Sequence, residues 1–145
     1  MKKSGFFNRL LGLNRDDEDE SYSELNHEEK DMIRGIVELS GTTVKEVMIP
    51  RIDVVFIASN MPPDEMLQAV TESAHSRFPV YKDTIDNVIG ILYAKDLLRY
   101  IVTKQEIDIE KIARVPYFIP ESKRINSLLH EFKRRRVHIA IAVDE

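Results

Sequence analysis

Apolar residues follow two different patterns along this chain, and the patterns alternate. Apolar positions three or four residues apart share one face of a helix, whereas short apolar runs between turn residues indicate buried strands. The first pattern predicts helices at residues 27–40, 44–48, 65–74, 94–103, 110–113 and 124–135. The second predicts strands at residues 52–57, 78–81, 88–93, 116–119 and 137–143. Alternating helices and strands favour an α/β fold, a small sheet with helices packed on one side.

Polar residues mark the starts of three of these helices. Asn26, with Glu29 three residues later, matches the reciprocal N-cap pattern of a helix beginning at His27. Thr43 is expected to cap the short helix that follows it, and Asp64 the helix at residues 65–74.

The alternating pattern contains an internal repeat. Placing 78–80 on 139–141 gives an offset of 61 residues (139 − 78 = 61). The same offset superposes other positions: Leu67 on Leu128, Ala58 on Ile119 and Asp83 on Asp144. Strand, helix and strand recur in order, which indicates two copies of one small unit. The second copy lacks its last strand and helix, so we expect an incomplete C-terminus with an open sheet edge.

Composition excludes several classes of function. The chain has 145 residues, 21 basic and 25 acidic, and its net charge of −4 gives no reason to expect a nucleic-acid partner. It has no cysteine, which excludes disulfides and thiolate metal sites and fits a reducing compartment. No apolar run approaches the ~20 residues that a membrane-spanning helix needs, so we expect a cytoplasmic chain.

The first 25 residues differ in composition from the rest. Residues 1–13 combine apolar and basic positions, which suits either an amphipathic anchor for a membrane or partner, or a frayed terminus. Asp16–Glu20 is an unbroken acidic run, and like charges this dense repel one another and stay solvated. Residues 1–25 are therefore predicted to be a disordered amphipathic and acidic segment.

Candidate chemistry is sparse. His75 and Ser76 are sequence neighbours without an oxyanion loop, and the four histidines are too scattered for a metal site, so neither catalysis nor a metal centre is expected. The basic run Lys133–Arg136 ends a helix, where it is either a solvated terminus or a contact for phosphate or anionic lipid.

Two other polar residues, Asp96 and Arg77, have two possible interpretations, of which the more specific is a ligand site. Asp96, in the first turn of a helix, offers a pair of acceptors suited to a ribose diol, and Arg77, at the start of a strand, offers a fork for phosphate. Met48–Pro50 could form an apolar slot for a base. The alternative makes Asp96 a helix-terminus charge and Arg77 a surface ion-pair partner.

Several blocks of residues together resemble a known family. The blocks are Val44–Arg51, Glu72–Val80, Gly90–Leu98, Pro120–Arg124 and His138–Glu145. They resemble, in order and over residues 26–145, the tandem cystathionine-β-synthase-type (CBS) domains of the CorC/HlyC family. Its members are bacterial magnesium and cobalt efflux proteins and hemolysin-like proteins. The implied fold is a pair of βαββα CBS units, the second incomplete, after an N-terminal helical segment.

The resemblance implies an adenine-nucleotide site, for ATP or AMP, with magnesium in some relatives. The family's ribose-binding turn, Gly-h-h-Thr/Ser-x-x-Asp (h, apolar), is present as Gly90–Asp96, where Asp96 matches and Tyr93 replaces the small hydroxyl residue. The binding residues expected are Met48, Ile49, Pro50, Arg77, Phe78, Pro79, Tyr93 and Asp96. No catalytic or metal-ligating residue is implied, and the chain is not expected to be an enzyme.

The implied organisation is a lead-in helix at 26–43, a first CBS domain at 44–106 and a partial second one at 107–145. The implied function is nucleotide-dependent regulation of magnesium and cobalt efflux. The alternative is a hemolysin-like peripheral membrane or structural interaction protein without nucleotide-dependent function. By resemblance we also expect a homodimer, and contact with a transporter at the inner face of the plasma membrane.

Overall fold

A computed structural model describes residues 22–144 of the chain. It divides into two compact units between Thr42 and Thr43. The predictions for residues 1–21, an amphipathic segment and an acidic linker, lie outside the described residues. Residues 22 and 23, which fall in the segment predicted to be disordered, are helical.

Helix α3 (His27–Ser40) lies in the first unit, and its predicted cap is confirmed. The Glu29 amide donates to the Asn26 side chain and the Asn26 amide donates to the Glu29 carboxylate, both at 2.9 Å. Gly41 follows the last residue of the helix as its C-cap, so the predicted end at residue 40 is confirmed. Among the described helices, none has the length and apolar character required to cross a membrane.

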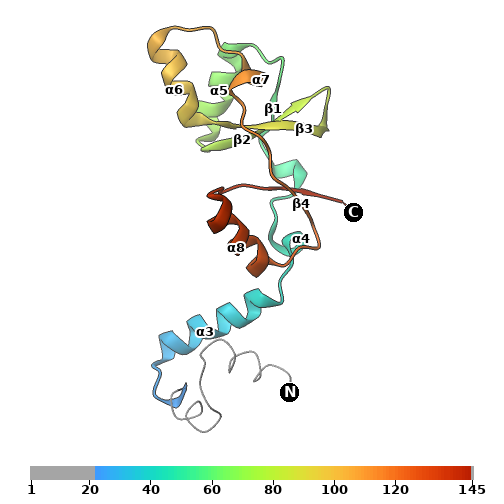
Figure 1. The fold of residues 1–145 in the computed structure, drawn as a ribbon. Coiled ribbons are helices and arrows are strands. Elements are labelled where there is room, and N and C mark those ends of the chain that lie inside the picture. Colours follow the sequence, from blue (N-terminus) through green and yellow to red (C-terminus); the bar gives the residue numbers. More distant parts are fainter. Residues whose placement is uncertain (1–21, 145) are drawn as a thin grey trace. The chain divides into compact units, whose positions relative to one another are not determined.

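The first copy of the repeat is a three-stranded sheet with helices on one face (Figure 1). Its elements are β1 (Ile57–Ala58), α5 (Pro63–Ser73), β2 (Arg77–Lys82), β3 (Thr84–Tyr93) and α6 (Ala94–Thr103). Strand β2 lies in the middle, parallel to β1 and antiparallel to β3. Apolar residues of the helices and of all three strands form one core, including the fully buried Ile57, Met66, Phe78, Val80, Leu92 and Leu97.

The second copy repeats the parallel strand pair with β4 (Phe118–Pro120), α8 (Ile125–Arg135) and β5 (Ile141–Val143). Ile57 pairs with Val80 in the first copy, and Phe118 pairs with Ile141 in the second. Both partners are displaced by the same number of residues (118 − 57 = 61 and 141 − 80 = 61). The predicted repeat is therefore confirmed, down to the register of its strands.

The helices repeat with a slightly different offset. Helices α5 and α8 are both 11 residues long and begin 62 residues apart (125 − 63 = 62). Each ends at a left-handed residue, Ala74 with φ 55° and Arg136 with φ 53°. Buried Leu128 therefore corresponds to buried Met66, and its predicted match to Leu67 is wrong by one residue. Counted from the matched strand residues Ala58 and Ile119, the helix begins five residues later in the first copy and six in the second (63 − 58 = 5 and 125 − 119 = 6).

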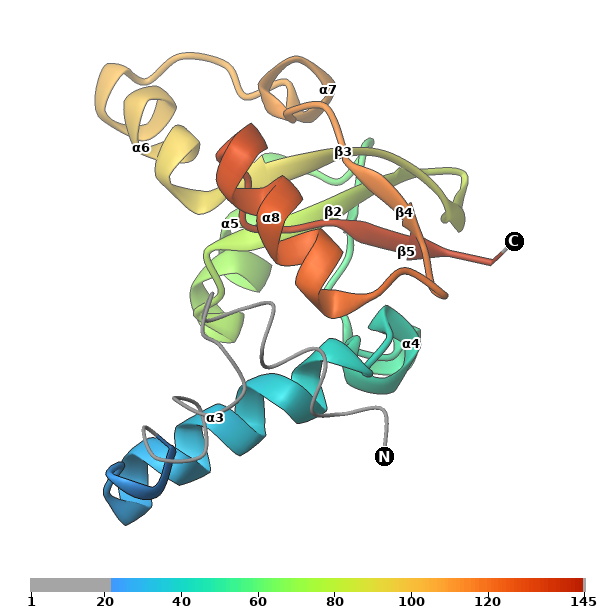
Figure 2. The same ribbon diagram turned by 60° about the horizontal axis from the view of Figure 1, so that its bottom comes forward.

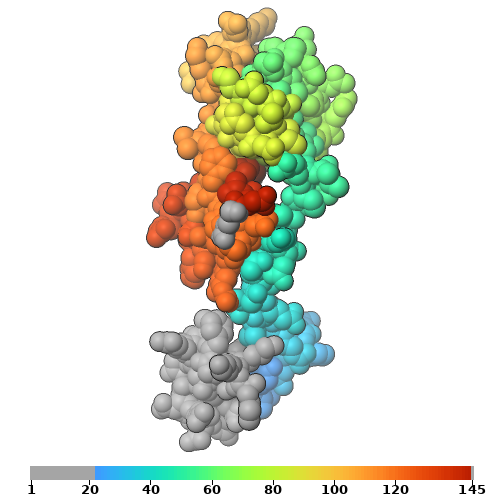
Figure 3. All heavy atoms as spheres, turned by 90° about the vertical axis from the view of Figure 1, so that its right-hand side faces the viewer, coloured from blue at the N-terminus to red at the C-terminus, as the bar shows by residue number. Residues whose placement is uncertain are grey.

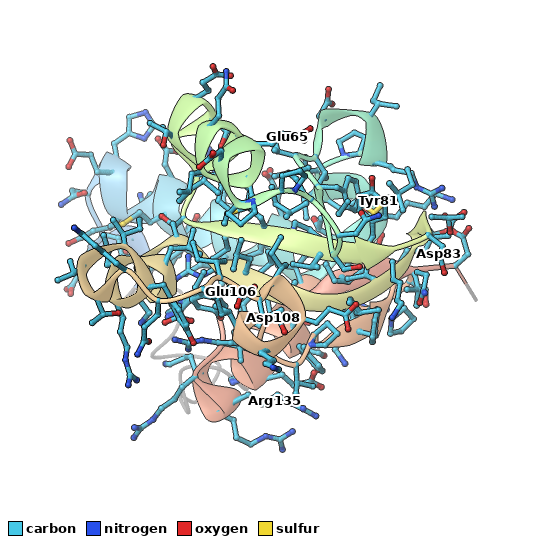
Figure 4. All side chains as sticks on the ribbon, turned by 90° about the horizontal axis from the view of Figure 1, so that it is seen from above. Glu65, Tyr81, Asp83, Glu106, Asp108 and Arg135 are labelled. Carbon is cyan, nitrogen blue, oxygen red and sulfur yellow. The ribbon has the colours of Figure 1, made fainter. Side chains whose placement is uncertain are left out.

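The short helix before each copy packs in the core of the other copy. Helix α4 (Val44–Val47) precedes the first copy, but Val44 is buried with Ile119 and Leu128 of the second. Helix α7 (Ile109–Ile112) precedes the second copy, but its isoleucines belong to the first core, and it lies beside β3 with Asp108 at its start (Figures 2 and 4). The domain boundaries predicted at residues 44 and 107 thus follow the sequence repeat. In the structure, however, the lead-in helix of each copy belongs to the core of the other copy.

Three predicted elements differ in the structure. The strand expected at 52–57 is wrong, because η1 (Arg51–Asp53) forms a tight turn in which the Asp53 amide donates to the Pro50 carbonyl at 2.9 Å. Ile52 is 91% exposed, and pairing begins only at Ile57. Likewise the last strand begins at Ile141, not at residue 137. Helix α5 begins at Pro63, since proline suits a position without a helical N–H partner. The predicted cap at Asp64 is therefore wrong, because Asp64 lies in the first turn.

Candidate functional site

A groove of about 820 Å³ lies within the second unit, lined by both copies and by the segment that leads into the first. Its lining residues come from 44–56, 75–79 and 85–88, and from 118–132 and 138–144. Figure 3 shows the side of the second unit where several of these segments meet. The C-terminal segment (red) lies between the segment that leads into the first copy (teal) and β4 (orange), below the β2–β3 hairpin (yellow). The volume falls within the range of small-molecule sites, roughly 300–1,000 Å³.

Arg77 is the lining residue with the clearest unmet bonding capacity. It begins β2 directly opposite Tyr93 of β3, and its guanidinium carbon lies 5.1 Å from the centre of the tyrosine ring. Its Nε atom is buried and has no hydrogen-bond partner among residues 22–144. A buried donor without a partner is costly, so this atom marks a position where an acceptor would be stabilised.

The charges of Arg51 and Asp86, at the edge of the groove, already neutralise each other. The two side chains are 2.6 Å apart and both are more than half exposed. An exposed ion pair of this kind contributes little to stability. Because Arg51 is already paired with Asp86, it is less available than Arg77 to bind an anion.

Four of the predicted site residues line the groove: Met48, Ile49, Arg77 and Pro79. Met48 and Ile49 follow α4 and are 38% and 71% exposed, so they present apolar surface to it. Arg77 and Pro79 project from the same face of β2, because side chains two residues apart in a strand point the same way. The structure therefore brings Met48, Ile49, Arg77 and Pro79 into one groove, whereas Pro50 of the suggested slot lies outside it.

The other four predicted residues do not line the groove. Phe78 requires a correction, because it is fully buried in the first core and its side chain is not available to a ligand. It lies between Arg77 and Pro79 in β2, so it faces the helices on the opposite side of the sheet. Pro50 is exposed at the start of η1. Tyr93 and Asp96 lie at the junction of β3 and α6, and the Tyr93 ring lies beside Arg77.

Asp96 is held by Arg114, a residue of the connector between the copies. Nε and Nη2 of Arg114 donate to the two carboxylate oxygens of Asp96, each at 2.8 Å. The hydrogen bonds from Arg114 lower the pKa of Asp96 below its ordinary value, against the opposing effect of burial. The same guanidinium carbon lies 4.1 Å from the centre of the Tyr93 ring.

Sequence reasoning missed Arg114. The connector showed no motif, and its partner, Asp96, lies 18 residues earlier in the chain, in the first turn of α6. Nothing in local spacing identifies such a contact, because it arises only when α7 packs against the first copy.

Two other candidate groups include a residue near an aromatic ring. His75 and Ser76 line the groove, with the His75 ring 6.2 Å from that of buried Phe78. In the basic run, Arg135 of α8, labelled in Figure 4, lies 4.3 Å from the ring centre of Tyr117. Within residues 22–144, no three histidine, aspartate or glutamate side chains gather as a metal ion would require.

The repeated strand–helix–strand units, the exchanged lead-in helices and the shared groove define a pair of CBS domains. The family pattern of the CBS domain matches residues 44–103. A solved CBS domain of a bacterial CNNM/CorC family Mg²⁺ transporter, in complex with ATP, is 41% identical with a TM-score of 0.76. That alignment covers 81% of this chain and 84% of the other.

Two curated proteins extend the comparison. Magnesium and cobalt efflux protein CorC of Pasteurella multocida is 39% identical over 99% of this chain and 53% of its own length. Hemolysin C of Brachyspira hyodysenteriae is 38% identical over 85% of this chain and 45% of its own length. The chain belongs to the CorC/HlyC family, and the predicted α/β fold of paired CBS units is confirmed. It spans about half the length of these curated relatives.

Proposed function

We propose that this chain is a regulatory CBS pair that binds an adenine nucleotide in the groove and contributes to magnesium and cobalt efflux. The observation that carries the proposal is the buried, unpartnered Nε of Arg77 beside an apolar wall in a groove of nucleotide size. The ATP complex of a relative 41% identical in sequence supports the choice of ligand. The efflux role follows the function named for CorC of Pasteurella multocida. Its site of action would be the inner face of the plasma membrane, in contact with a transporter.

The chemistry of the groove divides between charge and apolar contact. Arg77 would hold phosphate, because a guanidinium matches phosphate oxygens with parallel hydrogen bonds. Met48 and Ile49 would cover the base with apolar surface. Magnesium would accompany the phosphates of ATP and lower their charge. Since the groove is lined by both copies, a nucleotide with different affinities for two arrangements of the copies would shift the population between them.

The first prediction concerns Arg77. Isothermal titration of the chain with ATP and magnesium is expected to give saturable binding, and Arg77→Ala to weaken it about 10- to 100-fold. This range corresponds to the ~1.5–3 kcal/mol of a hydrogen bond to a charged group. Arg51→Ala is the matched control: it removes an arginine from the same groove whose charge is already paired with Asp86, so affinity is expected to change less than about threefold. Equal affinity of wild type and Arg77→Ala would contradict the phosphate role.

The proposed homodimer has a candidate surface on α6. Leu98, Ile101 and Val102 are 61%, 49% and 79% exposed on this helix, and burying such residues between two copies would supply apolar area. We expect Val102→Glu to convert the dimer to a monomer in sedimentation velocity. Val115→Glu places the same charge on a valine that is 92% exposed outside α6, and it should leave the dimer intact. A wild-type monomer, or a dimeric Val102→Glu protein, would remove this proposal.

A further inference from the structure

The two lead-in helices occupy equivalent places in the repeat. Helices α4 and α7 are both four residues long and start 65 residues apart (109 − 44 = 65), and each packs in the core of the opposite copy. The residues that end them have similar backbone conformations, φ −61° and ψ 150° at Met48, φ −60° and ψ 132° at Ala113. The next residues, Ile49 and Arg114, therefore stand at corresponding positions beside the two copies.

These two residues behave differently. Ile49 is 71% exposed and lines the groove. Arg114 is fixed to the first copy through its backbone and its side chain. Its amide and carbonyl pair with those of Ile91 on β3, both bonds at 2.8 Å, and its guanidinium spans both oxygens of Asp96.

The side chain of Arg114 occupies the carboxylate of Asp96 and the ring of Tyr93, the two groups that a nucleotide bound at the turn Gly90–Asp96 would contact. A ribose diol bound by Asp96 would donate to the same two carboxylate oxygens that accept from Arg114. The ring of Tyr93, which a base or sugar would contact, is 4.1 Å from the same guanidinium. The turn Gly90–Asp96 thus has its acceptors satisfied by the protein, whereas Arg77, next to it, has a buried donor left unsatisfied.

We propose that Arg114 competes with nucleotide for the turn Gly90–Asp96. By occupying the carboxylate of Asp96, Arg114 excludes nucleotide from this turn, and nucleotide binds only beside Ile49 and Arg77 in the groove. This inference rests on the proposed nucleotide binding and adds a determinant of where, and how many times, the ligand binds. It also reassigns Asp96 from a ribose contact to the anchor of Arg114.

Calorimetric stoichiometry with AMP tests the proposal on the full chain. We expect one AMP per wild-type chain, and a second, weaker AMP per chain when Arg114→Ala frees the carboxylate. Arg114→Gln, which retains the backbone pairing with Ile91 but cannot span both oxygens, is the second variant if Arg114→Ala does not fold. Asp96→Asn should leave wild-type affinity within about twofold, yet abolish the added site in the Arg114→Ala protein. Adding Tyr93→Thr, which restores the small hydroxyl of the family pattern, should tighten the added site.

The outcomes separate this inference from the proposed function. Absence of saturable binding in the wild type removes the proposed function, but a site gained in an Arg114 variant and lost again with Asp96→Asn still supports the competitor. A purely structural salt bridge predicts lower thermal stability of the Arg114 variants without any added site. The inference is overturned if neither folded Arg114 variant gains a site, or if Asp96→Asn weakens binding in the wild type.

Discussion

Phe78→Ala is expected to lower the free energy of unfolding of the second unit by about 3–5 kcal/mol, the largest effect that we predict. Phe78 has no exposed surface, is the largest of the fully buried side chains, and lies among residues of α5, α6 and all three strands of the first copy. Truncation would leave a cavity that the neighbouring helices and sheet could fill only in part. Urea unfolding followed by circular dichroism measures the loss.

Phe118→Ala is the matched control, because it makes the same truncation on the first residue of β4, where the side chain is 47% exposed. We expect a loss of about 1 kcal/mol, since roughly half of the apolar area is involved. Equal losses for the two variants would contradict the assignment of Phe78 to the core. They would reopen the sequence-based prediction that Phe78 contacts a ligand.

The repeat could be predicted from the sequence because it depends on short-range patterns. Alternation of apolar runs and helical spacing identified both copies, and helix α6 begins and ends at the predicted residues, Ala94 and Thr103. The segment 52–57 defeated the same reasoning. Its apolar run resembles a strand, but the hydrogen bond between Asp53 and Pro50 closes a turn first, and only Ile57 and Ala58 reach the sheet.

The side of the sheet on which a candidate residue lies could be predicted from alternation along its strand. Contacts between one copy and the connector to the other could not. Arg77 and Pro79 follow from β2 alone, and alternation in that strand should also have excluded Phe78. Arg114 could not be found in this way, because its contacts with Ile91 and Asp96 require α7 to pack in the first core. A sequence repeat gives the order of the elements in each copy, but not which copy receives each lead-in helix.

Gly90→Ala is expected to give the second largest loss of stability, because the connector at Ala113 and Arg114 packs closely against Gly90 of β3. A Cβ atom at Gly90 would lie 2.7 Å from the Ala113 Cβ and 3.1 Å from the Arg114 carbonyl oxygen. Neither of these atoms belongs to a flexible side-chain end, so Gly90→Ala must displace β3 or the connector. We expect a loss of about 1–3 kcal/mol in stability, as for other overpacked sites. Hydrogen exchange should become faster at the amides of Ile91 and Arg114, whose mutual hydrogen bonds hold the connector in place.

Gly35→Ala separates this steric effect from the general effect of replacing glycine. Gly35 lies within α3, and in the part of the chain that the structure describes nothing lies within 4 Å of an added Cβ. The same substitution there should therefore stabilise its helix by about 0.5–1 kcal/mol. The two glycine variants are thus expected to change stability in opposite directions. If Gly90→Ala left the unfolding midpoint and the exchange of the Arg114 amide unchanged, the connector would not be packed against β3. The anchoring of Arg114 beside Asp96 would then lose its structural basis.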